Sequence, residues 1–313
     1  QYGAQGIGLC RTERMFNEKD RIKLFVKMIM AKEREEKQKI LEKLQKLQKS
    51  DFIGILKAME GYKVTIRLLD PPLHEFLPSS KNKKVLARAK ELEEVNPMMG
   101  HRGVRLGITS PEIYEMQIKA VFEATAELVK KKINAKPQIM IPQVSSIAEL
   151  NHIKSIYDNV KSDMEKKYGI KFKINFGTML EVVRACLTAD ELADTAEFFS
   201  FGTNDLTQGV FSFSREDVEG KFLGDYMDKG LVEISPFQSI DKNGVGNLMK
   251  IGIKQGRVVQ KNLEIGICGE HGGDPNSVKF CHTADVTYVS ASPYRIPTAI
   301  LAAAQAVIEQ KKK

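Results

Sequence analysis

The chain alternates short apolar runs with longer stretches in which apolar residues recur every three or four positions. Short apolar runs are typical of buried strands, and the longer spacing is typical of helices with one apolar face. Their alternation predicts parallel strands joined by crossover helices. The predicted strands span residues 6–10, 64–69, 138–142, 173–180, 198–202, 264–268 and 286–290.

These strands predict an α/β fold, a (β/α)8 TIM barrel. Such a barrel has eight strands, so we expect the first β/α unit to lie before Gln1. The chain starts with glutamine instead of methionine, and a predicted strand follows almost at once. We therefore expect residues 1–313 to be one barrel domain, a fragment of a larger multidomain chain, with exposed strand edges where the first strand is missing.

Two connections between the strands are long. Residues 18–49 predict one charged helix with an apolar side that includes Ile22, Phe25 and Leu44. We expect it to pack on the barrel exterior, because the pattern is too short for a sustained coiled coil. Residues 207–262 predict an elaborated connection with helical stretches and a break at Ser235-Pro236, which carries at most a lid.

Composition excludes several classes of protein. A chain of 313 residues with 42% hydrophobic content can bury a large core. The net charge of +8 comes from lysines interleaved with acids, which favours solvated helix faces over a nucleic-acid patch. No apolar run approaches the roughly 18 residues of a membrane span, and no signal peptide opens the chain. The four cysteines match no zinc pattern, so we expect reduced thiols in a cytoplasmic protein, or in an organellar one.

Polar side chains follow the predicted strands at their carboxyl ends, where barrels of this class place their chemistry. They include two arginines, two carboxylates, an amide and a thiol. We expect them to converge into a site for a small anion and a divalent cation. In chain order they are Arg11, Arg67, Glu181, Asn204, Asp205 and Cys268.

Each residue type suggests a role. Arg11 and Arg67 carry planar forks that match phosphate or carboxylate oxygens. Glu181 and Asp205 supply hard oxygens that suit Mg²⁺ when substrate and water complete its shell. Taken singly, an arginine is also a common surface ion-pair residue, and Asn-Asp after a strand is a common turn or helix cap. Their joint placement favours the site.

Three further positions stay open on the residues alone. Cys268 ends an apolar run before three glycines, so it is either an acid/base thiol or a buried cysteine ahead of a turn. The loop at 96–105 carries Arg102, which either reaches over the barrel mouth to bind substrate or pairs with Glu93 and Glu94. Arg215 is similarly ambiguous.

Several stretches together resemble pyruvate, phosphate dikinase, in its carboxyl-terminal pyruvate/phosphoenolpyruvate (PEP)-binding barrel, a member of the PEP-utilising enzyme family. Phosphoenolpyruvate synthase and the first enzyme of the bacterial sugar phosphotransferase system share this barrel, but DPPLHEFLP and CGEHGGDP are similar to the dikinase. The matching stretches are GIGLCRTERMF, TIRLLDPPLHEFLP, NPMMGHRGVRLG, GTMLEVVRA, FFSFGTNDLTQ, GICGEHGGDP and YVSASPYRIP.

The resemblance implies a role for each matching residue. Arg11 and Arg67 would hold the substrate phosphate, and Glu181 and Asp205 would bind Mg²⁺. Gly202, Thr203 and Asn204 would contact the substrate. Cys268 would be the acid/base at the methylene carbon of PEP.

The resemblance also implies the reaction and the partners. A phosphohistidine on a swivelling domain would exchange its phosphoryl group with pyruvate to form PEP, and an ATP-binding domain of the parent chain would recharge the histidine. No Thr-Ser-His stretch surrounds any of the five histidines, so we expect only this partial reaction, in a homodimer formed through the barrel. The alternatives are the barrel of one of the two related enzymes and a non-catalytic barrel that binds PEP or supplies a dimer surface.

Two positions depart from the family pattern. Val183 stands where we expect proline in Glu-Val-Pro-Arg, and we expect it to loosen the turn after Glu181 and so to affect metal affinity. Ala291 stands where many relatives carry a second cysteine, to which we assign no chemistry.

Overall fold

The computed structural model describes residues 2–77 and 82–311. Its seven strands form a sheet whose order follows the chain, and the pairs β2–β3, β4–β5, β5–β6 and β6–β7 are parallel. Parallel strands in sequential order with helices between them are the topology of a (β/α)8 barrel, so the predicted α/β class is confirmed. The strands are β1 (Gly6–Arg11), β2 (Lys63–Arg67), β3 (Lys136–Ile141), β4 (Asn175–Leu180), β5 (Phe198–Gly202), β6 (Glu264–Cys268) and β7 (Tyr288–Ser290).

Strand positions agree closely with the predictions. Residues 198–202 and 264–268 match to the residue, whereas the predicted strand 64–69 ends earlier, at Arg67. The backbone N–H of Leu69 donates to the side chain of Gln117 at 2.8 Å, so a side-chain acceptor replaces the strand partner there. Buried apolar residues therefore continue beyond the end of the hydrogen-bonded ladder.

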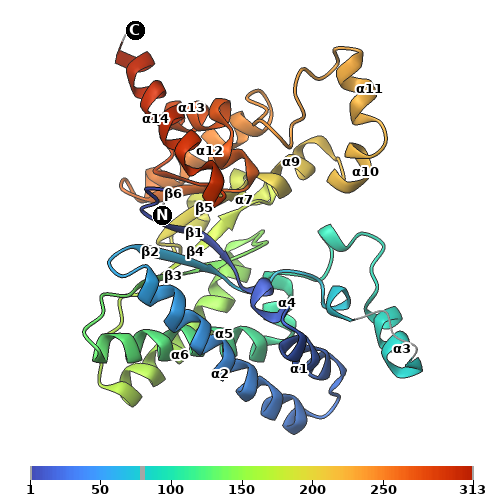
Figure 1. The fold of residues 1–313 in the computed structure, drawn as a ribbon, viewed down its shortest axis with the longest axis vertical. Helices are drawn as coiled ribbons and strands as arrows, with labels where there is room; N and C mark the ends of the chain where they lie inside the picture. Colours follow the sequence, from blue (N-terminus) through green and yellow to red (C-terminus); the bar gives the residue numbers. More distant parts are fainter. Residues whose placement is uncertain (1, 78–81, 312–313) are drawn as a thin grey trace. The chain divides into compact units, whose positions relative to one another are not determined.

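The chain divides into two compact units. Unit 1 contains residues 1–9, 144–147 and 177–313, and unit 2 contains residues 10–143 and 148–176. The helices of unit 2 are η1 (Thr12–Phe16), α1 (Lys19–Met30), α2 (Arg34–Ala58), η2 (Leu73–Phe76), α3 (Lys83–Leu92), η3 (Pro97–Met99), α4 (Val104–Thr109), α5 (Pro111–Lys130) and most of α6 (Ile147–Tyr168). In Figure 1, α2 and α5 lie side by side, and α3 contacts η2.

The single helix predicted for residues 18–49 is wrong. Helix α1 ends at Met30, Ala31 is extended (ψ 124°), and α2 begins at Arg34 and continues to Ala58. The break lets each helix bury its own apolar side. Phe25 of α1 packs between Phe16 and Phe76, with ring centroids 4.6 and 4.4 Å apart.

Helix α2 packs against α5 and α1. It buries Leu44 and Phe52, among other residues. Its lysines pair with acids of α5, Lys37 with Glu112 and Lys49 with Glu127. The basic charge is thus compensated locally, which agrees with a solvated helix face.

Unit 1 combines β4–β7 with two groups of helices, α7, α8 and α12 in contact with one another and α13 packed on α14. Its helices are α7 (Val183–Leu187), α8 (Ala189–Ala193), α9 (Thr203–Phe211), α10 (Arg215–Glu219), α11 (Leu223–Asp228), α12 (Val245–Val259), η4 (Glu270–Gly273), α13 (Pro275–Thr283), η5 (Pro293–Arg295) and α14 (Ile296–Lys311). Within this unit, a Cβ at Gly8 of β1 would lie 2.7 Å from Cβ of Ser290 on β7, so β1 and β7 approach closely.

The predicted elaboration after β5 is present. Residues 212–240, here named the arm, carry α10 and α11 and project beyond α9 in Figure 1. The arm has a small core of its own, formed by Val218, Leu223 and Phe237. Among the described residues, no helix combines the length and apolar content that crossing a membrane requires.

Candidate functional site

Cys268 ends β6 inside unit 1, and its side chain is buried. Its Sγ donates to the backbone carbonyl of Phe201 at 3.6 Å, on the neighbouring strand β5. The other cysteines lie in different surroundings. Burial raises the pKa of Cys186 and Cys281 to about 12, and burial together with nearby Glu13 raises the pKa of Cys10 to about 11. These three are therefore protonated, inert thiols at neutral pH.

Glu181 follows β4 directly and is 2% exposed. Its carboxylate lies over the backbone of Gly202 at the end of β5. A Cβ at position 202 would collide with Oε2 of Glu181 and would lie 2.7 Å from Cε of Met179. Only glycine at 202 therefore leaves room for the carboxylate at this edge of the sheet.

Thr203, Asn204 and Asp205 form the first turn of α9, immediately after β5. The Oγ1 atom of Thr203 is 2.7 Å from Nδ1 of His271, and Nε2 of His271 is 2.9 Å from the carbonyl oxygen of Pro236. A carbonyl only accepts, so Nε2 carries the proton and Nδ1 accepts from the threonine hydroxyl. Burial lowers the pKa of His271, which agrees with this neutral form.

The side-chain oxygen of Asn204 is buried and has no hydrogen-bond partner among the described residues. It faces the strand that carries the thiol, because a Cβ at Gly269 would lie 3.5 Å from this oxygen and 2.6 Å from Oγ1 of Thr203. An orphaned buried oxygen is costly unless a ligand or cation satisfies it. This atom is therefore a ready acceptor for a bound group.

The donor set fits a weakly caged cation. In the described part of the chain, no three acidic, histidine or cysteine side chains are grouped to hold a metal. Glu181 and Asp205 are hard anionic donors at the ends of adjacent strands β4 and β5, and the Asn204 oxygen adds a neutral one. Mg²⁺ commonly uses few protein oxygens and takes the remainder from substrate and water.

The predicted arginines belong to unit 2, where they surround a buried carboxylate. Asp70 is fully buried and pairs with Nη1 of Arg67 at 3.0 Å and with Nε of Arg102 at 3.0 Å. Burial alone would raise the pKa of Asp70, but the charges of Arg67, Arg102 and Arg11 outweigh it and lower the pKa. Asp70 therefore stays ionised and orients two guanidinium groups.

Glu13, which like Asp70 was not singled out from the sequence, also belongs to this group. It accepts from Nη2 of Arg67 at 3.2 Å and from the backbone N–H of Asp70 at 2.8 Å. The only sequence signal was its position two residues past Arg11 at a strand end. Three arginines against Glu13 and Asp70 leave an excess of one positive charge, which suits an anion.

The structure decides one of the two alternatives for the loop at 96–105. Arg102 pairs with Asp70, and Glu94 accepts instead from the backbone N–H of His101 at 2.6 Å. A Cβ at Gly103 (φ +57°) would meet Oδ1 of Asp70 at 3.0 Å, so glycine lets this loop approach the aspartate. The alternative in which Arg102 pairs with Glu93 or Glu94 is therefore wrong, and substrate binding by Arg102 stays a prediction.

The structure shows what surrounds Val183 and Ala291, the two residues that depart from the family pattern. Helix α7 begins at Val183, a first helical position that suits proline as well. A Cβ built on Gly209 of α9 would lie 3.2 Å from Cγ2 of Val183. The turn after Glu181 is therefore packed against α9. Ala291 contacts a small cluster of Val278, Ala299 and Ala302.

The chain is similar to known proteins over almost its whole length. Residues 1–308 match the family model described as PEP-utilising enzyme, PEP-binding domain. The chain is 52% identical to pyruvate, phosphate dikinase of Entamoeba histolytica over 100% of the chain and 38% of that protein. It is 48% identical to the dikinase of Clostridium symbiosum over 99% of the chain and 37% of that protein.

A chloroplastic relative is similar to the same extent. Pyruvate, phosphate dikinase 1 of Arabidopsis thaliana is 50% identical over 98% of the chain and 33% of its own length. The chain thus spans about a third of the curated relatives it matches. Among solved structures, a citrate lyase from Burkholderia xenovorans covers 82% of the chain at a TM-score of 0.43 and 11% identity, with 63% of that structure covered.

Proposed function

Because this chain belongs to the PEP-utilising enzymes, whose PEP-binding domain it matches, we propose that it catalyses phosphoryl exchange between a phosphohistidine and pyruvate to form PEP. This is the pyruvate half-reaction of a dikinase that converts ATP, phosphate and pyruvate into AMP, diphosphate and PEP. The observation that carries the proposal is the joint presence of the Cys268 thiol, Glu181 and the orphaned Asn204 oxygen at adjoining strand ends of unit 1.

Cys268 would move the proton. Toward PEP, the methyl carbon of pyruvate gives a proton to the Cys268 thiolate, and the enolate oxygen attacks the phosphorus. The bond from phosphorus to the histidine nitrogen breaks, and its electron pair stays on the nitrogen. Toward pyruvate, the protonated thiol, which donates to Phe201 in the structure, returns its proton to the methylene carbon.

The arginines of unit 2 would hold the phosphate. Arg67 and Arg102 are fixed by Asp70, so they lose little freedom when an anion binds. The side chain of Arg11 is exposed, and it would add a further fork to the phosphoryl oxygens. Thr203, whose hydroxyl proton points to His271, would offer a lone pair to the substrate.

Glu181 and Asp205 would hold Mg²⁺, with the Asn204 oxygen nearby. When bound, this ion would stabilise the negative charge that develops on the oxygen of pyruvate. The chain's own contribution is to exclude side chains at Gly202 and to present hard oxygens. The phosphohistidine domain, the ATP-binding domain and a homodimer formed through the barrel are the partners we propose, in a cytoplasmic or organellar compartment.

Exchange of the methyl protons of pyruvate with deuterated water tests this proposal, because it needs neither the histidine nor ATP. We expect Mg²⁺-dependent exchange in the wild type and a loss of roughly 100-fold in Cys268→Ser, with Mg²⁺-dependent oxalate binding retained. Cys281→Ser is the matched control and should exchange normally. Retained exchange in Cys268→Ser would remove the acid/base role. Oxalate binding without exchange in the wild type would point to the non-catalytic barrel.

A further inference from the structure

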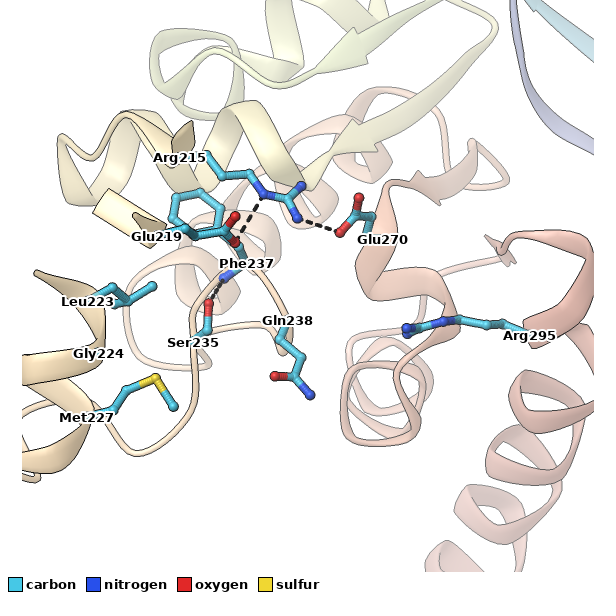
Figure 2. A pocket seen from close by; sticks show the side chains of 10 residues that line it. All are labelled: Arg215, Glu219, Leu223, Gly224, Met227, Ser235, Phe237, Gln238, Glu270 and Arg295. Atoms are coloured by element: carbon cyan, nitrogen blue, oxygen red, sulfur yellow. Dashed lines mark hydrogen bonds and ion pairs between the residues drawn. The ribbon is translucent and has the colours of Figure 1, made fainter. Parts of the chain in front are cut away.

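A cavity lies in unit 1 between the arm and the segments that follow β6 and β7. Its volume is about 430 Å³, within the range of about 300 to 1,000 Å³ that is common for small-molecule sites. Figure 2 shows side chains converging on it from the arm, from η4 and from η5. The lining residues are Arg215, Glu219, Leu223, Gly224, Met227, Ser235, Phe237, Gln238, Glu270 and Arg295.

Arg295 is the charged group of this cavity that remains available. Its guanidinium points into the cavity from the side opposite Leu223 and Met227 of α11 (Figure 2). Within residues 2–77 and 82–311, this guanidinium makes no hydrogen bond or ion pair. An arginine fork that faces a cavity without a partner is suited to an oxyanion.

The backbone holds Arg295 in this position. A Cβ at Gly273 would lie 2.5 Å from Cδ of Arg295 and 3.0 Å from its Cβ, so the arginine stem runs directly over the glycine. Gly273 is buried in η4. Gly273 belongs to the stretch GICGEHGGDP, and Arg295 belongs to the stretch YVSASPYRIP. Neither residue has a role in the proposed reaction.

The charges on the opposite wall are already paired. Arg215 contacts Glu219 at 3.2 Å and Glu270 at 2.7 Å, and its guanidinium lies 5.7 Å from the ring centre of Phe237. Two glutamates against one arginine leave this wall with one net negative charge, so Arg295 is the cationic group of the lining that is left for an anionic ligand. The side chain of Gln238 lies between the two walls and offers an amide donor (Figure 2). Leu223 and Met227 add an apolar surface.

From this arrangement we infer that the cavity binds a small organic anion. Its carboxylate or phosphate group lies on Arg295 and Gln238, and its apolar part lies against Leu223 and Met227. The cavity contains none of the residues that the proposed reaction uses, so this inference can be tested independently of the reaction.

Calorimetric titration tests the site, with Mg²⁺ left out. Phenyl phosphate and benzoate carry the two kinds of oxyanion on the same ring, inorganic phosphate carries the anion alone, and benzyl alcohol carries the ring alone. We call phenyl phosphate and benzoate the ring anions. We expect at least one of them to bind more tightly than inorganic phosphate and more tightly than benzyl alcohol. The stronger of the two then identifies the preferred oxyanion.

Arg295→Ala should weaken that ring anion by about 10- to 100-fold, which corresponds to one lost charge-assisted hydrogen bond. Arg257→Ala is the matched control, since Arg257 of α12 pairs with Asp285 outside the cavity, and it should bind as the wild type does. Met227→Ala should weaken the ring anion and leave inorganic phosphate unchanged.

Cys268→Ser should bind the ring anion normally, which separates this site from the proposed reaction. The inference is overturned if Arg295→Ala binds like the wild type, if both arginine variants lose affinity equally, or if neither ring anion binds at millimolar concentration. Circular dichroism of each variant confirms that the chain remains folded.

Discussion

His271 connects three parts of unit 1 through one buried ring. It accepts from Thr203 of α9 and donates to Pro236 of the arm, and the ring itself belongs to η4. Because burial lowers its pKa, the folded chain keeps this ring neutral at a pH where the unfolded chain protonates it. Below about pH 6.5 the unfolded state therefore binds more protons, and the free energy of unfolding falls as the pH falls.

His271→Gln tests this linkage. Glutamine can still accept and donate, but it does not titrate. We expect the free energy of unfolding of the wild type to fall as the pH drops from about 6.5 to the lowered pKa of the folded state. In the variant, the slope of the free energy of unfolding against pH should be smaller by the contribution of about one proton. Urea unfolding at a series of pH values measures both slopes. Identical slopes would show that His271 is not the titrating group. His282→Gln, on the surface of α13, is the control.

At the scale of elements, the contact between β4 and β5 depends on a missing side chain. Gly202 ends β5 at the place where the carboxylate of Glu181 follows β4. Gly202→Ala should weaken Mg²⁺-dependent oxalate binding by about 10-fold or more, because the new methyl group displaces the carboxylate. Calorimetry measures the affinity.

Gly54→Ala is the matched control for this change. Gly54 lies inside α2, and a Cβ there would meet nothing within 4 Å. We expect this variant to raise the free energy of unfolding by about 0.5 to 1 kcal/mol, since alanine favours helix over glycine. Unchanged oxalate affinity in Gly202→Ala would show that the carboxylate does not serve the ligand.

For the whole molecule, ligand binding and stability are linked. A ligand that binds only the folded chain adds about 2.7 kcal/mol to its stability at 100 times its Kd. Mg²⁺ with oxalate should therefore raise the Tm of the chain, and a chelator should abolish the shift. Asp205→Asn and Glu181→Gln should each reduce it. A shift that persists with the chelator in the wild type would exclude Mg²⁺ as the mediator.

Features that depend on a local pattern of residues could be predicted from the sequence. Strands 198–202 and 264–268 are mostly apolar, apart from Ser200 and Glu264, so burial on both faces could be predicted from them alone. The polar residues after each strand were equally visible, because parallel strands present their carboxyl ends at one edge. The helix break at residues 31–33 was not, since polar residues continue through it and only the packing of Phe25 and Leu44 requires it.

Which polar groups meet depends on the fold of the chain and could not be predicted from its sequence. Asp70 rather than Glu94 holds Arg102, and His271 finds its acceptor on Pro236, 35 residues away in the chain. Arg295 faces a cavity because its stem crosses a glycine from another loop. A residue's type sets what it can bind, but its partners depend on distances between segments remote in sequence. Folding sets those distances, and no local pattern encodes them.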